Sequence, residues 1–174
     1  MTAIVFSHDC TILDACCVIN IHESGSIGDI LSAVAGRIAI ARFVLQQEVR
    51  GVNLQPVVKS GLLTVADYTD EEAITALVFA TDPRMDDGEA VTGAIAKHRN
   101  WAIATDDAKA ISFFTERTAQ LQLLSTPELM KHWADSAAPS PEKVRNALQN
   151  VENRGDYKPH VGHRLHGWWQ ANRR

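Results

Sequence analysis

Short apolar runs recur along the chain, and each is followed by a polar or small residue. Their length, their flanking residues and their content of isoleucine, leucine and valine are typical of strands that are buried in a sheet. Five strands are predicted on this basis, at residues 11–15, 37–41, 61–66, 101–105 and 121–124.

Between these runs, apolar residues recur at the spacing of an amphipathic helix. Thr69 and Asp86 stand where two of the helices begin, and Thr126 is the expected N-cap of another, with Pro127 at its favoured first position. Helices are predicted at residues 16–22, 29–35, 43–49, 70–80, 87–98, 108–116 and 142–151, and one more begins at residues 126–128.

The alternation of strands and helices sets the expected fold class. Strands that alternate with helices form α/β folds around a largely parallel sheet. We therefore expect a three-layer α/β/α sandwich with a mostly parallel five-stranded sheet. A chain of 174 residues with 45% hydrophobic content can bury one core but is short for two. The sequence predicts one domain at residues 1–136, followed at residues 137–174 by a linker, a further helix and a tail.

The tail combines basic, histidine and tryptophan residues. Residues 157–174 hold four basic side chains and no acidic one, three histidines spaced three apart, and the pair Trp168-Trp169. No convincing apolar periodicity begins after residue 155, which predicts a flexible segment. We expect the tryptophans to dock on the same domain, a second subunit or a partner. The alternatives are an arm that binds nucleic acid by charge and stacking and, least favoured, a histidine metal site.

The charge distribution limits the choice of ligands. The formal net charge is −4, and without the basic tail the remaining residues 1–156 carry about −8. An acidic body does not steer a polyanion toward itself over long range. Nucleic-acid binding would therefore need metal ions, local basic residues or a basic partner.

The cysteines and the hydropathy pattern indicate the compartment. Cys10, Cys16 and Cys17 are odd in number and lack the spacing of a disulfide framework or of a CxxC metal site. The first residues lack a basic region followed by a sustained apolar stretch, and no run approaches the roughly twenty apolar residues that a membrane span needs. We expect a cytoplasmic protein that does not enter a membrane.

Five acidic residues stand where predicted strands or helices begin or end. In a parallel sheet the ligand crevice lies at the carboxyl ends of the strands, so acids that are far apart in sequence can meet there. Carboxylates that are brought together at neutral pH repel one another unless protons or a cation intervene. A hard divalent cation is the natural partner, which favours metal-assisted phosphodiester hydrolysis. The acids are Asp14, Glu48, Glu89, Asp106 and Asp107.

Each acid also has a purely structural interpretation. Asp14 can be an N-cap, and Glu48 can be a solvated acid beside Arg50, although the helix dipole disfavours it there by roughly 0.3–1 kcal/mol. Asp86 and Glu89 have the spacing of a capping box. One of the two aspartates after the fourth strand can cap the next helix while the other binds a ligand.

Four short segments, in this order and spacing, resemble the PIN-domain family, in particular its VapC-like toxins, which are small metal-dependent ribonucleases. The resemblance covers roughly residues 10 to 130. The segments are residues 12–19 (Ile-Leu-Asp-Ala-Cys-Cys-Val-Ile), 44–49 (Val-Leu-Gln-Gln-Glu-Val), 87–90 (Asp-Gly-Glu-Ala) and 104–107 (Ala-Thr-Asp-Asp).

The resemblance implies a set of metal ligands for Mg²⁺ or Mn²⁺, namely Asp14, Glu48, Glu89 and one of Asp106 or Asp107. The family's strand-end motif often reads Thr or Ser, any residue, Asp, which would select Asp107. Related sequences with a Gly-Glu-Ala helix start align Asp106 instead. The family commonly has Ser or Thr where this chain has Cys16, whose thiol forms weaker hydrogen bonds than a hydroxyl.

The function implied is that of a hydrolase, a metal-dependent endoribonuclease that acts as the toxin of a type II toxin–antitoxin pair. Its partners would be RNA as substrate and a cognate antitoxin, and a homodimer is left open. In this mechanism the cations bind the scissile phosphate and lower the pKa of a bound water. The alternative is a weakly active or inactive PIN-like module that binds RNA or protein. A small-molecule enzyme would require a phosphate or cofactor loop, and the chain shows none.

Overall fold

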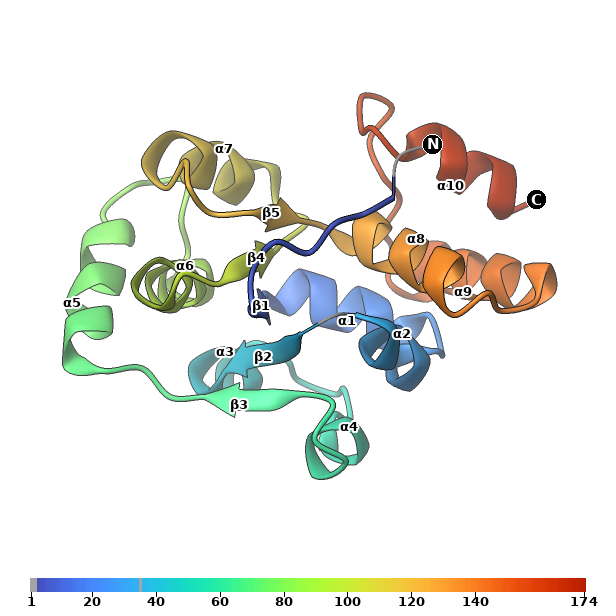
Figure 1. Cartoon of the computed structure of the whole chain (residues 1–174). Helices are drawn as coiled ribbons and strands as arrows, with labels where there is room; N and C mark the ends of the chain where they lie inside the picture. Colours follow the sequence, from blue (N-terminus) through green and yellow to red (C-terminus); the bar gives the residue numbers. More distant parts are fainter. Residues whose placement is uncertain (1–2, 35) are drawn as a thin grey trace.

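The computed structural model describes residues 3–34 and 36–174, and it contains a five-stranded sheet in the order β3-β2-β1-β4-β5 (Figure 1). All four pairings are parallel, and β1 lies at the centre. The predicted α/β class and five strands are confirmed, and the sheet is wholly parallel. The strands are β1 (Cys10–Leu13), β2 (Arg37–Ala41), β3 (Thr64–Ala66), β4 (Ala102–Ala104) and β5 (Leu123–Leu124).

Helices cover both faces of the sheet, so the predicted three layers are present. In Figure 1, α5, α6 and α7 lie on one side of the sheet, and α1, α2, α8 and α9 lie on the other. The helices are α1 (Ala15–Glu23), α2 (Ile27–Ala33), α3 (Arg42–Gln47), α4 (Gln55–Lys59), α5 (Asp70–Phe79), α6 (Asp87–Arg99), α7 (Ala108–Arg117), α8 (Thr126–Ser136), α9 (Pro141–Arg154) and α10 (His166–Asn172).

The central strand explains why the sheet forms from such short runs. Every residue of β1 is buried, because the strand has neighbours on both edges and helices over both faces. Ile12 lies opposite Ala39 of β2 and Ile103 of β4. Continuous apolar runs are characteristic of parallel strands covered on both faces.

Several predicted helix boundaries need correction. The N-cap of α8 is Ser125, not Thr126, because the Thr126 side chain is used elsewhere: its hydroxyl donates to Asp106 Oδ2 at 2.5 Å. Helix α4 was not predicted. The helix expected at residues 29–35 begins earlier and ends at Ala33, and residue 35 lies outside the described residues. By contrast, the predicted capping box at Asp86 is confirmed, and Thr69 caps α5 in the same way.

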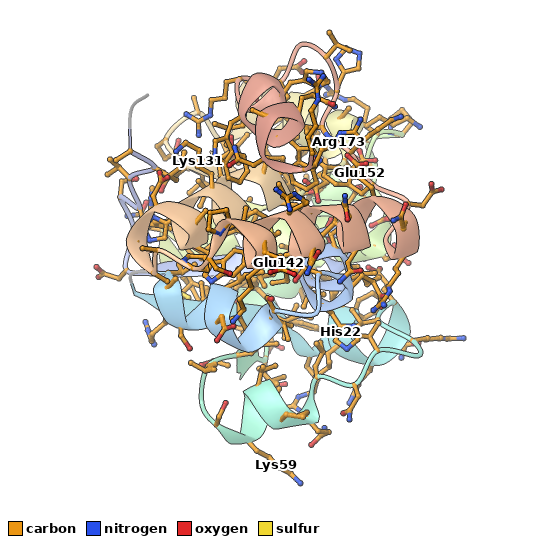
Figure 2. All side chains as sticks on the ribbon, turned by 90° about the vertical axis from the view of Figure 1, so that its right-hand side faces the viewer. His22, Lys59, Lys131, Glu142, Glu152 and Arg173 are labelled. Carbon is orange, nitrogen blue, oxygen red and sulfur yellow. The ribbon has the colours of Figure 1, made fainter. Side chains whose placement is uncertain are left out.

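The tail is ordered, and its tryptophans dock on the same chain. The expectation of a flexible segment after residue 155 is therefore wrong, whereas the expected docking is confirmed. Trp168 and Trp169 are buried, and α10 lies beside α9 (Figure 2). Figure 2 shows Arg173 next to Glu152, and their side chains form an ion pair of 2.6 Å. Burial of the indoles leaves them unavailable for stacking on nucleic-acid bases.

The three tail histidines do not converge on one site. His163 Nε2 contacts Ser125 Oγ at 3.2 Å, and its Nδ1 accepts from the Leu165 backbone N–H. His166 Nδ1 lies 3.0 Å from the Pro159 carbonyl oxygen, and His160 Nδ1 accepts from the Gly162 N–H. Each ring thus serves the local backbone or a neighbouring side chain.

The length and hydropathy of the helices show whether any of them could span a membrane. In the ranges 3–34 and 36–174, every helix falls short of the length and apolar character that a bilayer span requires.

Candidate metal centre

The carboxyl end of the sheet collects acidic side chains from four places in the sequence. The Asp14 backbone N–H donates to the Ala104 carbonyl oxygen at 2.9 Å, which joins the ends of β1 and β4. The charge of Asp14 acts on Glu48 and Glu89, and the charge of Asp107 acts on Glu89. Asp14, Glu48, Glu89 and Asp107 therefore lie close enough to act on one another by charge. Among the described residues, the group whose possible ligand atoms all lie within 4.8 Å of one another is a different one, Cys16, Cys17 and Asp106.

Asp14 is the most enclosed of these acids. Its side chain does not cap α1, although the residue occupies the N-cap position. Its Oδ2 accepts hydrogen bonds from Thr105 Oγ1 at 3.0 Å and Cys16 Sγ at 3.3 Å. Its Oδ1 makes no hydrogen bond to any described residue, although Asp14 is only 4% exposed. A buried carboxylate oxygen without a partner is costly in free energy, so it marks a place where a ligand would be favourable.

Glu48 lies against the first turn of α6, where Gly88 makes room for it. A β-carbon at Gly88 would overlap the Glu48 carboxylate. The Gly88 backbone amide and the positive end of the helix dipole favour a negative charge at this position. Arg50 donates to the Gln47 carbonyl oxygen, so Glu48 is not held by a neighbouring arginine. The cost of an anion at the end of α3 is thus offset by the start of α6.

Glu89 combines the structural role with a place in the cluster. Its backbone N–H donates to Asp86 Oδ1 at 2.8 Å, and its Oε2 accepts from the Asp86 N–H at 2.9 Å. Its other oxygen, Oε1, accepts no hydrogen bond from a described residue. The capping box therefore fixes Glu89 and leaves one carboxylate oxygen for a ligand.

Asp106 and Asp107 point to different partners. Asp106 accepts from the Thr126 backbone N–H at 2.9 Å, from the Thr126 hydroxyl, from Asn20 Nδ2 at 2.8 Å and from Cys17 Sγ at 3.4 Å. Both of its oxygens are thus used to tie the end of β4 to α1 and α8. Asp107 caps α7 with Oδ1, which accepts hydrogen bonds from the backbone N–H groups of Lys109 and Ala110, so its Oδ2 is not used by the cap.

Burial and mutual repulsion shift the acids toward the protonated form. Burial raises the pKa of Asp14, and the negative charge of Asp86 adds to this effect. Burial, followed by the charges of Asp86 and Asp14, raises the pKa of Glu48 to about 7. Burial is also the main reason that the pKa of Glu89 rises to about 7. Without a cation, the cluster is an unfavourable concentration of negative charge at neutral pH.

Two participants were not identified as site residues from the sequence. Asp86 was interpreted only as a helix cap, yet its charge acts on Asp14, Glu48 and Glu89. Asp86 lies at the start of the same helix as Glu89, and this position could have indicated from the sequence that its charge reaches the acid cluster. Thr105 supports Asp14 through its hydroxyl, which also accepts from the Asp107 N–H at 3.2 Å. Thr105 thus gives Asp14 Oδ2 a hydroxyl donor, and Cys16 gives the same oxygen a thiol donor.

An open hollow of about 340 Å³ has Asp106 and Asp107 in its lining, whereas Asp14, Glu48 and Glu89 are not among the residues that line it. Cys16, Asn20 and Asp107 line one part of it, and Asp156 and Tyr157 of the segment between α9 and α10 line another. The tail thus contributes a wall next to the acids.

We expect the metal-free protein to lose stability as the pH rises from about 4.5 to about 7. Glu48 and Glu89 have ordinary pKa values of 4.5 and folded values of about 7. The folded state binds more protons in this window, so its advantage is lost as the pH rises. Glu128, with a pKa lowered to about 2, acts only below this window. Thermal unfolding in EDTA at pH 5 to 8 measures the slope.

Glu48→Gln should flatten the dependence of the melting temperature on pH. Mn²⁺ should stabilise the wild type more at pH 8 than at pH 5, because the cation competes with protons for the carboxylates. A wild-type melting temperature that rises steadily with pH in EDTA would contradict the assigned repulsion.

Comparison with known proteins does not identify a family. No protein-family model matches the sequence, and no curated protein matches it. The resemblance to PIN domains therefore stays a hypothesis based on four short segments, and a function has to be argued from the acid cluster itself.

Proposed function

We propose that this protein is a PIN-like, metal-dependent endoribonuclease that holds Mg²⁺ or Mn²⁺ in its acid cluster, and that it is the toxin of a type II toxin–antitoxin pair. The observation that carries the proposal is the buried Asp14 carboxylate, whose Oδ1 has no hydrogen-bond partner among the described residues and whose pKa is raised by burial and by the charge of Asp86. The toxin assignment rests on the resemblance of the four segments to VapC-like proteins.

The donor set fits a hard divalent cation. Carboxylate oxygens are the preferred ligands of Mg²⁺ and Mn²⁺. Asp14 Oδ1 has no hydrogen-bond partner among the described residues, and the hydrogen bonds of Glu89 and Asp107 use Oε2 and Oδ1, which leaves Glu89 Oε1 and Asp107 Oδ2. The Glu48 carboxylate lies against Gly88. We assign these four residues as the ligands. Asp106 is assigned a supporting role because its oxygens are occupied by other donors.

When bound, the cation would activate a water molecule and stabilise charge on the phosphate. The protein's own residues supply the rest. Glu48 and Glu89 have pKa values of about 7 without metal, so they hold protons that a cation displaces on binding. Arg50 and Lys109 are exposed and follow Glu48 and Asp107 by two residues, so we assign them as candidates for contact with the RNA backbone.

The runner-up is a PIN-like binding module that cleaves RNA slowly or not at all. One observation favours it: Cys16 places a thiol, a weak hydrogen-bond donor, against Asp14 at 3.3 Å. The two proposals differ in whether RNA is cut or only bound.

The test is cleavage of single-stranded RNA by the purified protein with Mn²⁺ or Mg²⁺, compared with EDTA. We expect metal-dependent cleavage that falls at least about 100-fold in Asp14→Asn, because even supporting residues of metal sites contribute 10–100-fold. The matched control is Asp9→Asn, which changes an exposed aspartate before the other end of the same strand. It should cleave like the wild type.

Cleavage that survives both EDTA and Asp14→Asn would contradict the proposal and indicate a contaminating nuclease. Metal-sensitive RNA binding without cleavage would support the binding module instead. The toxin assignment is tested with the same pair of proteins, since induced wild type should arrest growth of the host and Asp14→Asn should not.

A further inference from the structure

Cys16 is the one thiol that touches the acid cluster. It lies in the first turn of α1 and is half-buried. Its Sγ lies 3.3 Å from Asp14 Oδ2 and 3.5 Å from Thr105 Oγ1, and it accepts a hydrogen bond from the Asp106 backbone N–H at 3.2 Å. A sulfur atom therefore sits beside the carboxyl group whose other oxygen has no partner.

Cys17 and Asp106 lie close to Cys16, but their chemistry is already used. The ligand atoms of these three residues all lie within 4.8 Å of one another. Cys17 is fully buried, and its Sγ contacts Asp106 Oδ2 at 3.4 Å and the Thr126 hydroxyl at 3.6 Å. Asp106 accepts three of its hydrogen bonds on Oδ2 and one on Oδ1. Cys16 contacts both Asp14 of the acid cluster and the backbone of Asp106.

The spacing of Cys16 and Asp14 suits one shared ion. A tetrahedral zinc has Zn–S bonds of about 2.3 Å and Zn–O bonds of about 2.0–2.2 Å, so its sulfur and oxygen ligands lie about 3.5 Å apart. The observed separation of Sγ and Oδ2 is 3.3 Å. Asp14 Oδ1 is buried without a hydrogen-bond partner among the described residues, which is independent evidence that the same carboxyl group can bind a further ligand.

We propose that Cys16 turns the acid cluster into a mixed sulfur and oxygen site that prefers a thiophilic divalent cation of the Zn²⁺ class, with Cys16 Sγ and Asp14 as two of its ligands. The inference rests on the proposed function, because it takes the acid cluster to be a cation site. A thiolate ligand increases the preference for zinc-like ions over Mg²⁺ and Mn²⁺ beyond the preference that carboxylates alone give. The site then binds the softer ion more tightly than it binds Mg²⁺ or Mn²⁺.

The experiment titrates the full chain with Cd²⁺ and Co²⁺ as spectroscopic probes and with Mn²⁺ as the hard-ion reference. We expect one equivalent of Cd²⁺ or Co²⁺ to give a thiolate-to-metal charge-transfer band, and Cd²⁺ to bind at least about 100-fold more tightly than Mn²⁺. Cys16→Ser should abolish the band and cut this preference about 10-fold or more, while it still binds Mn²⁺.

Cys17→Ser is the matched control, since it changes the adjacent thiol, and Cys10→Ser is a second control in case the fully buried Cys17 is needed for folding. Both should keep the band. A band that persists in Cys16→Ser, or Cd²⁺ binding to the wild type without a band, overturns the proposal. The ribonuclease proposal would still stand after either of these outcomes if the wild type binds Mn²⁺ and Asp14→Asn does not. If neither Mn²⁺ nor Cd²⁺ binds, both proposals fail.

Discussion

Replacing Gly88 by alanine should lower metal-dependent RNA cleavage by about 100-fold or more without loss of stability. A β-carbon at this position would overlap the Glu48 carboxylate and push it out of the cluster. The backbone of Gly88 has no positive φ, so alanine fits the helix. Glycine within a helix is less favourable than alanine by roughly 0.5–1 kcal/mol. Stability should therefore be retained or rise slightly while the site is lost.

The measurements are the cleavage rate, Mn²⁺ affinity by calorimetry and the melting temperature of the same preparation. Gly28→Ala is the matched control, because Gly28 is also helical and an added β-carbon there would meet no atom within 4 Å. Wild-type cleavage and Mn²⁺ affinity in Gly88→Ala would show that Glu48 is not needed for the site.

Trp169→Ala should lower the free energy of unfolding by about 3–5 kcal/mol, the usual cost of truncating a buried aromatic side chain. The Trp169 indole is fully buried, its Nε1 donates to Glu152 Oε1 at 2.8 Å, and its ring packs edge-on against Tyr157. Denaturation by urea measures the change. For a chain of this length the melting temperature should fall by about 6–20 °C.

Val161→Ala is the control on the same segment, since Val161 is 77% exposed and should contribute little. A Trp169→Ala protein as stable as the wild type would mean that the tail adds no stability. Because Tyr157 lines the hollow beside the acids, the same substitution should also weaken RNA cleavage in proportion to the disorder that it causes.

The sheet could be predicted because its strands are apolar on both faces and end at recognisable residues. Strand β2 was predicted with its observed limits, Arg37–Ala41. Helix α10 could not be predicted, because its buried residues are the adjacent Trp168 and Trp169, which carry no helical period. The position of α10 depends on contacts with α9 that only the tertiary structure provides.

The acid cluster was predictable as a group but not atom by atom. Two adjacent aspartates follow β4, and the choice between them depends on donors that come from distant segments. Asn20 and Thr126 occupy Asp106, and this leaves Asp107 beside Glu89. The unfavourable position of Glu48 at the end of α3 was visible in the sequence, whereas the start of α6 that compensates for it was not.

The strand order has a consequence for how the protein is made. Strand β1 forms early in the sequence, yet one of its two neighbours, β4, follows about ninety residues later. Asp14 therefore meets Asp107 only after most of the chain has left the ribosome. A nascent chain from which β4 and Asp107 have not yet emerged has no complete acid cluster, so any activity that depends on the cluster begins only when β4 has joined the sheet.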